Sequence, residues 1–373
     1  MERDSKLKTF VENIKFPLLA ILLSFLIGAL FIIWTGNNPL VAYGALLSGS
    51  LGGLDRFGQT LLKTTPLIFT GLAVSFAFRC GLFNIGAEGQ YVIGALTTVA
   101  AGYIFNSIFG DLPRFIFIPL VMLAGALGGA LWAAIAGFLK SKLGVHEVIT
   151  TIMLNYTSIH VSNFFVRTAL NPSTLEGTTQ KAYTVLLPES ARLTQLKEII
   201  PWFGYSSVHT GIFIAIICAI IAYFILFKTT LGYEIRSVGQ NSHAAEYGGI
   251  SVSKNLVLAM IISGMFAGLA GATQVAGLNY KVDMAPISPG YGFTGIAVAL
   301  VGKNHPLGVL ASALLFGILS NGARRMQIEG IPKEVVGIIQ GIIIIFIAGE
   351  RIIKFVSEIR ERRNRKCNVE GVN

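Results

Sequence analysis

The sequence predicts an all-α, polytopic membrane protein with about ten transmembrane helices arranged as two inverted five-helix repeats. Of its 373 residues, 53% are hydrophobic and only 13% are charged, whereas soluble domains carry about 25% charged residues. Many windows of roughly 18 or more residues contain almost no charge, which is long enough for a helix to cross a bilayer. One short pattern that occurs twice along the chain indicates the two halves.

Ten apolar segments are predicted as spans. The first is too long for the core of a signal peptide and is not followed by a small-residue cleavage site, so we expect it to stay in the protein. The eighth is the shortest and the most interrupted by polar residues. In chain order the segments are residues 17–34, 61–78, 91–109, 116–139, 148–166, 210–227, 255–278, 288–302, 306–322 and 335–353.

Basic residues between the spans predict that both termini are cytoplasmic. Lys140 and Lys142 follow the fourth span, Lys228 and Arg236 follow the sixth, and the tail 354–373 is strongly basic. These groups fall on one side if both ends are inside, although two arginines after the ninth span and a lysine after the seventh do not. The net charge of +10 therefore reflects topology, and nucleic-acid binding by the tail is the less favoured reading.

Sequence features of catalysis and metal binding are absent. The three cysteines, Cys80, Cys218 and Cys367, are scattered and suit neither a disulfide framework nor a metal pattern. No GxxxxGK[ST], HExxH or GxSxG pattern occurs. We therefore expect no catalytic residues, no cofactor, no metal and no ATP hydrolysis by this chain. Energy for active transport would come from a partner chain or from an ion gradient.

An internal repeat relates the two halves. Residues 119–127 read PLVMLAGAL and residues 306–314 read PLGVLASAL, and Glu147-Val148 recurs as Glu334-Val335 at the same offset. Five spans separate the equivalent elements, so the fourth and ninth spans run in opposite directions. Inverted repeats of this kind are characteristic of transporters, whose substrate path lies where the halves meet.

Two polar, glycine-rich breaks occupy corresponding positions in the halves. Residues 81–90, GLFNIGAEGQ, precede the third span, and residues 277–295, GLNYKVDMAPISPGYGFTG, precede and enter the eighth. Interrupted helices of this kind point to the binding site of a transporter. The backbone that they free must bond to protein or line a cavity.

Polar and aromatic residues in and near the breaks are the candidates for the substrate pathway. A carboxylate at bilayer depth is normally paired or lines a wet path, which draws attention to Glu88. The alternative is that these groups bond the freed backbone, or that Glu88 pairs with Arg79. Asn155 either contacts a neighbouring helix or faces the path. The candidates are Asn84, Glu88, Gln90, Asn155, Ser288, Tyr291, Phe293 and Thr294.

Two extramembrane loops stand out. Residues 229–254 form a long polar cytoplasmic loop, in which Asn241 is expected to cap a short helix over 242–247 that a following glycine ends. Such a helix is either a docking site or a plain connector. The outer loop, 167–207, is long for a simple connection and is expected to cover the pathway mouth or receive a partner. The semi-polar stretch 41–60 is expected at the outer surface.

Several motifs resemble one known family across nearly the whole chain. GLFNIGAEGQ, GQNSHAAEYGGI (239–250) with SGMFAGLAGA (263–272), and SPGYGFTGIAVALVG (288–302) resemble an ABC-transporter permease of the family that contains simple-sugar, branched-chain amino acid and nucleoside importers. NIGAEGQ is most like the nucleoside-type branch. The resemblance implies a single permease domain over residues 1–373 in the cell membrane, without enzymatic activity.

The resemblance also implies the partners. An extracytoplasmic substrate-binding protein or lipoprotein would deliver a small polar solute, and a separate ABC ATPase subunit would drive the transport. A second, different permease subunit is expected, since nucleoside-type systems often pair two permeases. The residues that match the family's cytoplasmic loop, and would therefore couple to the ATPase, are Gly239, Asn241, Ala244, Ala245 and Gly249.

The substrate is expected to be a nucleoside, with a simple sugar as the alternative. A nucleobase would stack on aromatic residues such as Phe76, Phe83, Tyr91 or Phe293. A second class of function, an ion-coupled secondary transporter, also suits inverted repeats and would depend on Glu88 or Asp283 as a coupling acid. A membrane-embedded enzyme is disfavoured because no catalytic constellation is present.

Overall fold

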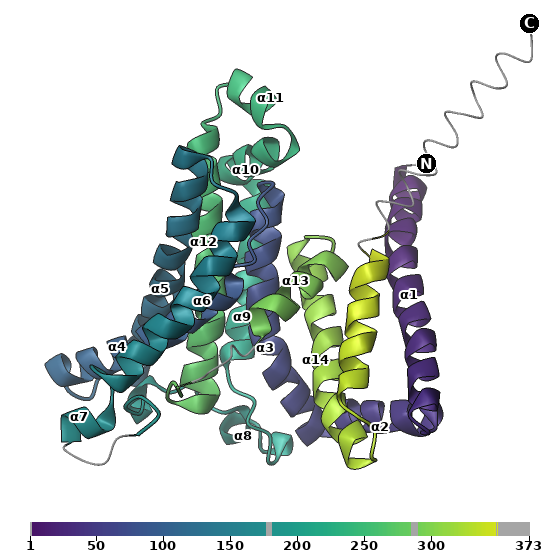
Figure 1. Cartoon of the computed structure of the whole chain (residues 1–373), viewed down its shortest axis with the longest axis horizontal. Coiled ribbons are helices and arrows are strands. Elements are labelled where there is room, and N and C mark those ends of the chain that lie inside the picture. Colours follow the sequence, from purple (N-terminus) through teal and green to yellow (C-terminus); the bar gives the residue numbers. More distant parts are fainter. Residues whose placement is uncertain (1, 177–180, 285–289, 348, 350–373) are drawn as a thin grey trace, which may run out of the picture. The chain divides into compact units, whose positions relative to one another are not determined.

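The computed structural model describes residues 2–176, 181–284, 290–347 and 349, which fold into helices and connections without a β-strand (Figure 1). Contacts divide the chain into two compact units, one of Met1–Ala45 with Ala323–Asn373 and one of Leu46–Gly322. The helices are α1 (Glu2–Trp34), α2 (Pro39–Leu51), α3 (Leu54–Arg79), α4 (Ala87–Phe109), α5 (Arg114–Leu143), α6 (Glu147–Arg167), α7 (Pro172–Glu176), α8 (Leu196–Ile199), α9 (Gly211–Lys228), α10 (Thr230–Gln240), α11 (Ser242–Tyr247), α12 (Val252–Gln274), α13 (Tyr291–Val301) and α14 (Pro306–Ile328), with a further helix over Glu334–Ile347.

Seven helices among the described residues are long and apolar enough to cross a membrane: α1 from Pro17, α3, α4, α5, α9, α12 with its π-helical extension to Asn279, and α14. The prediction of about ten full spans is not confirmed. The eighth predicted span, α13, has 11 residues, which rise only about 16 Å against a hydrocarbon core of about 30 Å. Glu334–Ile347 is also short. Asn, Ser, Thr and His residues make α6 less apolar than the seven.

The first unit contains a close helix contact near the N-terminus. A Cβ placed on Gly28 of α1 would lie 2.5 Å from Cγ1 of Ile339 in the helix Glu334–Ile347, so the two helices touch at the glycine. The hydroxyl of Tyr43 in α2 donates a hydrogen bond to the carbonyl of Phe25, and the two rings pack edge to face. Small residues allow such close backbone approach within a membrane.

The second unit is built around α12, which lies between α5 and α3 (Figure 1). Small residues bring the backbones into contact. A Cβ placed on Gly268 of α12 would lie 2.3 Å from the carbonyl oxygen of Gly125 in α5, and one on Gly94 of α4 would lie 2.4 Å from Cα of Gly268. Because any side chain would separate these helices, glycine at these positions sets the packing of α4, α5 and α12.

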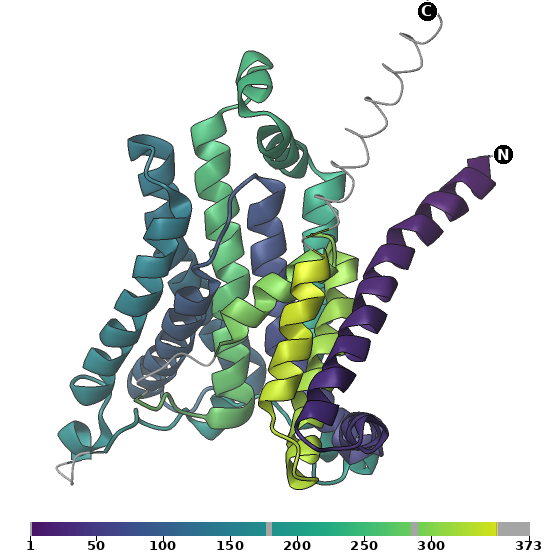
Figure 2. The ribbon, with the colours of Figure 1, turned by 45° about the vertical axis from the view of Figure 1, so that its right-hand side comes forward.

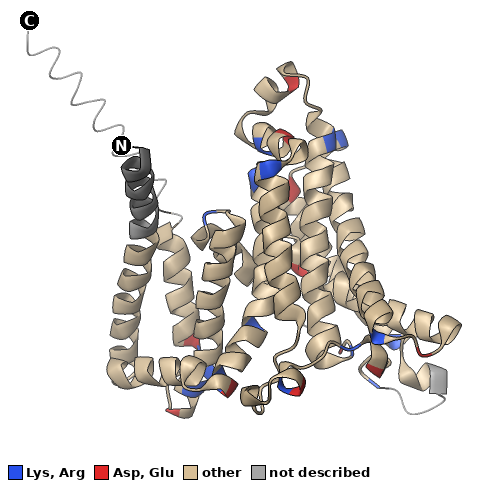
Figure 3. Ribbon diagram, turned by 180° about the vertical axis from the view of Figure 1, so that it is seen from behind, with Lys and Arg blue, Asp and Glu red and all other residues tan. Residues whose placement is uncertain are grey.

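Charged side chains of the second unit gather at the two ends of its helices and are sparse between them (Figure 3). One of these ends carries α10 and α11 and is named here the coupling end; the other carries α7, α8 and the loop residues 181–210 and is named the loop end (Figure 1). Such a distribution suits a protein whose middle zone lies in hydrocarbon, where charge is costly. The cytoplasmic placement of the termini stays a prediction.

The two helices that carry the repeated Pro-Leu pattern run in opposite directions. α5 ends at the coupling end, where the Ser253 hydroxyl of α12 donates to the carbonyl of Ser141 at 3.4 Å. α14 begins at the coupling end, where the ring of His305 packs on Phe227 of α9 with 5.2 Å between centroids. Opposite polarity of equivalent helices is the geometry that an inverted repeat requires.

The outer loop is hydrogen-bonded by its backbone to the end of α12 and the segment that follows it. The N–H of Leu193 donates to the carbonyl of Ala276 at 2.8 Å, and that of Leu187 to the carbonyl of Tyr280 at 2.7 Å. A short ladder continues at Thr184 with Val282 (2.9 Å). Residues 182–193 of this loop are therefore bonded to the loop end of α12 and are not a loose connection.

His209, just before α9, predicts a pH dependence of stability. Its side chain is 1% exposed, its Nδ1 accepts the N–H of Gly211 at 3.1 Å, and burial lowers its pKa to about 4. The unfolded chain takes up this proton near pH 6.5. Stability is therefore complete above about pH 6.5 and falls, by up to roughly 3 kcal/mol, as the pH drops toward 4.

The variant His209→Gln tests this dependence. Glutamine keeps an acceptor near Gly211 but does not titrate, so its thermal midpoint in detergent should change less than that of the wild type between about pH 7.5 and about pH 5. An equal loss in both proteins would contradict the assignment of the pH dependence to His209.

Candidate functional site

The first break turns the chain back into the protein. α3 ends at Arg79 and α4 begins only at Ala87, and Figure 2 shows the connecting segment running back beside α3 before α4 starts. Asn84 and Gln90, on either side of the start of α4, are each only 1% exposed. The break is thus an internal structure, and its polar groups need partners within the protein.

Asn84 and Gln90 form a closed amide network. The Nδ2 of Asn84 donates to Oε1 of Gln90 at 2.9 Å, and Nε2 of Gln90 donates back to Oδ1 of Asn84 at 3.1 Å. The same Nδ2 also donates to the hydroxyl of Ser263 in α12 at 2.8 Å, which in turn donates to the carbonyl of Ala73 in α3 at 2.6 Å. The network joins α3, α4 and α12 and fixes the shape of the break.

Asn155 of α6 bonds the freed backbone at the start of α4. Its Oδ1 accepts the N–H of Gly89 at 2.8 Å, and its Nδ2 donates to the carbonyl of Ile85 at 3.0 Å. The side chain is 6% exposed. Of the two readings of the sequence, contact with a neighbouring helix is therefore the one that this geometry supports.

Glu88 joins the first break to the second. Its Oε1 accepts the N–H of Gly290 at 2.7 Å, and its Oε2 accepts the N–H of Gly292. These two N–H groups open α13, whose N-cap Gly290 adopts φ +84°, a conformation that favours glycine. A carboxylate here satisfies free donors and meets the positive end of the helix dipole. This junction of Glu88 with residues 290–292 is named here the break contact.

Arg79 bonds the other end of α13 instead of pairing with Glu88. Its Nε donates to the carbonyl of Asn304 at 2.8 Å, and its guanidinium lies 5.3 Å from the ring centre of Phe227. Burial, and then the charge of Arg79, lower the pKa of neighbouring His305. α13 is thereby held at its N-terminus by Glu88 and just beyond its C-terminus by Arg79.

Lys63 lies beside the break contact and was not among the sequence candidates. Its Nζ lies 3.3 Å from the hydroxyl of Tyr291, the first residue of α13, and the ring of Tyr291 packs on that of Tyr91 with 5.7 Å between centroids. The signal was present in the sequence, because Lys63 is the only charged residue within the predicted span 61–78, and an ionisable group in a membrane helix is a functional candidate by default.

The remaining aromatic and polar candidates divide between the core and the surface. Phe76 is 1% exposed and packs in the core against Phe266, so it does not present a free ring. Phe293 is 50% exposed, and the hydroxyl of Thr294 donates to the carbonyl of Gly290 at 3.0 Å. Ser288 lies outside the described residues. Among the described ranges, no group of three or more His, Cys, Asp or Glu side chains is placed to hold a metal ion.

Comparison with known proteins identifies the family. The model for the permease component of branched-chain amino acid transport systems matches residues 56–348. The chain belongs to this permease family. The guanosine ABC transporter permease protein NupP of Bacillus subtilis is 42% identical over 93% of the chain and 96% of its own length. The nucleoside ABC transporter permease protein NupB of Lactococcus lactis is 39% identical, over 92% of both chains.

A glucose ABC transporter permease protein, TsgB13 of Haloferax volcanii, is 33% identical to the permease over 89% of the chain and 86% of its own length. No solved structure gives a significant match. Family membership and the seven long apolar helices make the permease a multi-pass integral protein of the cell membrane.

The predicted short helix at the coupling end of the permease is confirmed as α11. Oδ1 of Asn241 accepts the N–H of Ala244 at 3.0 Å, which caps the helix as expected. Gly249 has φ +82° after it. Ala244 is exposed, whereas Ala245 is 5% exposed and packs inward. Among the candidates for ATPase coupling, Ala244 is therefore the residue within α11 that offers an exposed side chain, while Gly239, Asn241 and Gly249 beside the helix are also exposed.

Gly239, at the end of α10, touches the beginning of the first break. A Cβ placed on it would lie 2.2 Å from the carbonyl oxygen of Arg79, and a Cβ on Gly81 would lie 3.4 Å from Cα of Gly239. The backbone of α10 thus lies directly on the chain that leaves α3. A movement of α10 would therefore be transmitted to the first break by direct contact between the two backbones.

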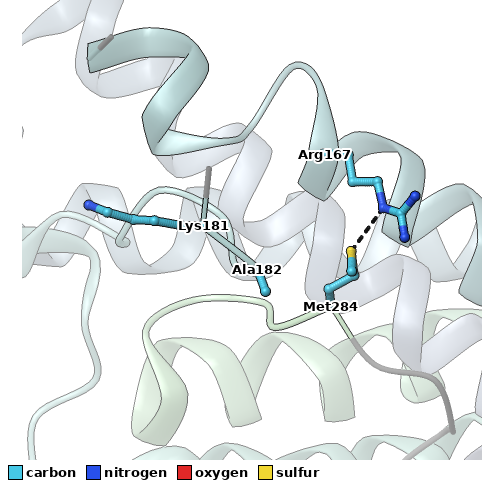
Figure 4. Close-up of a pocket in the computed structure, with 4 residues that line it drawn as sticks. All are labelled: Arg167, Lys181, Ala182 and Met284. Atoms are coloured by element: carbon cyan, nitrogen blue, oxygen red, sulfur yellow. Dashed lines mark hydrogen bonds between the residues drawn. The ribbon is translucent and has the colours of Figure 1, made fainter. Parts of the chain in front are cut away.

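Two cavities open at the loop end. One of about 270 Å³ is lined by Arg167, Lys181, Ala182 and Met284, with Nε of Arg167 3.1 Å from the Met284 sulfur (Figure 4). Another, of about 210 Å³, lies between Arg114 at the start of α5 and loop residues that include Glu189, Arg192 and Tyr280. Both carry charged groups and are formed by residues other than those of the break contact.

Proposed function

We propose that this permease is the membrane-spanning subunit of an ABC importer that translocates nucleosides. The proposal of a nucleoside substrate rests on the likeness to two relatives named for guanosine and nucleosides, at 42% and 39% identity over more than nine-tenths of the chain. A glucose permease relative at 33% identity favours a simple sugar as the second candidate. The chain would not hydrolyse ATP itself.

Three partners complete the proposed importer: a separate ATPase at the coupling end, an extracytoplasmic binding protein at the loop end, and a second permease. Two pairs of related permeases, each from one organism, support the second permease. Bacillus subtilis has NupP and a further guanosine permease, NupQ, which is 33% identical to this chain, and Lactococcus lactis has NupB and NupC. A heterodimer is therefore proposed in preference to a homodimer.

The proposed topology has two inverted five-helix halves and both termini in the cytoplasm. The opposite directions of α5 and α14 support it, as does the position of a break before both α4 and α13. In this topology the short α13 is the interrupted helix of the second half. It enters the hydrocarbon layer of the membrane but does not cross it. The coupling end of the second unit then faces the cytoplasm.

The proposed mechanism runs from α11 to the break contact. The ATPase would engage the exposed face of α11, and the connected α10 would press through Gly239 on the backbone of Arg79. Arg79 is bonded to the carbonyl of Asn304 beyond α13, and Glu88 holds the start of α13. Shifting α13 relative to α4 would open the substrate path toward one side or the other.

Transport assays test the proposed function directly. Proteoliposomes that hold both permeases, the ATPase and the binding protein are expected to accumulate labelled guanosine only with ATP on the ATPase side, and an excess of glucose should not compete. Uptake that follows an ion gradient without ATP would contradict the importer and favour the secondary transporter. Competition by glucose with no uptake of nucleosides would instead favour the sugar.

Ala244→Arg tests the docking surface on α11. Because Ala244 is exposed, the arginine should leave the permease folded while it blocks close approach of the ATPase. We expect uptake to fall at least about tenfold and the ATPase to be lost on purification, since hot-spot positions at interfaces commonly cost about 2 kcal/mol or more.

Ala244→Ser is the matched control and should keep both uptake and the ATPase. Ala245→Arg is not an equivalent test, because Ala245 is buried and its replacement would disturb the fold. Normal uptake by Ala244→Arg with an intact complex would contradict docking at this helix.

A further inference from the structure

We propose that Lys63, Tyr91 and Tyr291 form a subsite that recognises the base of the nucleoside, and that Lys63 makes it prefer 6-oxopurines to adenine. This inference rests on the proposed function, because it specifies the substrate of the same pathway. The three residues come from α3, α4 and α13; the break contact holds α13 on α4, and α13 also packs on α3. The subsite therefore exists only when the two breaks meet.

Lys63 is a cation within a membrane helix, and the part of the chain that the structure describes places no counter-ion beside it. It lies nine residues after Leu54, the first residue of α3, or about 14 Å along the helix. Within the described ranges its Nζ contacts the hydroxyl of Tyr291, at 3.3 Å, and the ring of the same residue, at 5.8 Å from the centroid. No carboxylate of the described residues forms an ion pair with it. Since an ammonium carries three donors, Lys63 retains the capacity to bind further acceptors.

Tyr291 provides an aromatic ring next to this cation, and the buried Tyr91 supports it from behind. Tyr91 is 5% exposed, Tyr291 is half-buried, and their rings are inclined by 40°. Glu88 binds the N–H groups of the residues on either side of Tyr291, so the start of α13 is held and the ring has little freedom. A flat base can stack on the open part of the Tyr291 ring, because aromatic pairs prefer offset contacts at about 4.5–7 Å.

The donors of Lys63 distinguish one purine from another. Guanine and hypoxanthine present two adjacent acceptors on one edge, N7 and O6, whereas adenine presents the N7 acceptor beside an amino donor. An ammonium can only donate, so it binds both acceptors of a 6-oxopurine but opposes the amino group of adenine. The subsite therefore favours guanosine and inosine over adenosine by about tenfold, at the low end of what one such pair supplies.

In the complete importer, we expect the variant Lys63→Met to lose selectively the preference for 6-oxopurines over adenine. Initial rates of uptake are compared for guanosine, inosine and adenosine at concentrations that saturate the binding protein, so that its own selectivity does not enter. Lys63→Met keeps a side chain of similar length but removes every hydrogen-bond donor, so it should lower the ratio of the guanosine uptake rate to the adenosine uptake rate about tenfold. Lys63→Arg keeps donors for both acceptors and should retain most of the preference.

The outcomes separate this inference from the proposed function. If the wild type takes up no nucleoside, the proposed function fails. If it takes up nucleosides and Lys63→Met leaves the ratio unchanged, or lowers all rates equally, the base subsite is wrong. Where Lys63→Met does not assemble, Tyr291→Phe decides, because it removes only the hydroxyl that orients Lys63 and should reduce the ratio severalfold; an unchanged ratio in that variant overturns the inference.

Discussion

Replacing Glu88 by glutamine is expected to reduce ATP-driven uptake at least tenfold. The carboxylate accepts two backbone N–H groups at the start of α13, and hydrogen bonds to a charged group contribute about 1.5–3 kcal/mol each. Glutamine keeps one acceptor oxygen but places an amide donor against the other N–H. The charge that complements the helix dipole, worth about 0.3–1 kcal/mol, is lost as well. α13 should then separate from α4.

Gly292→Ala tests the same contact without removing the carboxylate. Its Cβ would lie 2.3 Å from the backbone nitrogen of Glu88, so it should push α13 from α4 and reproduce the loss of uptake. Glu329→Gln is the matched control, because Glu329 forms a half-exposed ion pair with Arg325 and such pairs contribute about 0–1 kcal/mol. Normal uptake by a folded Glu88→Gln protein would contradict a role for the break contact.

The second large effect is expected at Gly268. Its replacement by alanine would bring Cβ within 2.3 Å of the carbonyl oxygen of Gly125 in α5, and backbone cannot move aside as a flexible side chain does. Overpacking of a tight core lowers the stability of the fold by about 1–3 kcal/mol. Because the added methyl group meets backbone, we expect Gly268→Ala to lose about 3 kcal/mol or more. We expect little folded permease in detergent and a clearly lower thermal midpoint.

Gly44→Ala is the control for this prediction. It adds the same methyl group to a helix glycine that has nothing within 4 Å of the added atom. Because alanine favours helix over glycine by about 0.5–1 kcal/mol, the folded yield should be unchanged or slightly higher. If Gly268→Ala has the same thermal midpoint as Gly44→Ala, the close packing of α12 on α5 is not needed for stability.

The sequence was sufficient for the class of fold and for the local elements that depend on neighbouring residues. Apolar length predicted the long helices, and the Asn241 cap and the glycines after it predicted α11, because a cap depends on residues three or four positions away. The eighth span is not confirmed as a full crossing. Hydropathy over residues 288–302 cannot show that Gly290 begins the helix so late that 11 residues remain.

The partners within the site were beyond the sequence. Glu88 was identified as a candidate, but its bonds to Gly290 and Gly292 join residues that are far apart in the chain, and no local pattern encodes that contact. The expected alternative, pairing with Arg79, followed from charge alone and overlooked a backbone carbonyl as the partner of Arg79. Lys63 was missed because the span around it was judged by its average polarity rather than residue by residue.

The hydrogen bonds between the outer loop and the end of α12 have a mechanical consequence. α12 with its extension has 28 residues and acts as a stiff rod about 42 Å long; residues 248–251 connect its start to α11, and its end is bonded to residues 182–193. A tilt of about 5° at its inner end displaces the far end by about 4 Å, and residues 182–193 travel with it through their backbone bonds. In the proposed topology, residues 182–193 would therefore be displaced by the same helix that the ATPase side moves, without a separate driving contact.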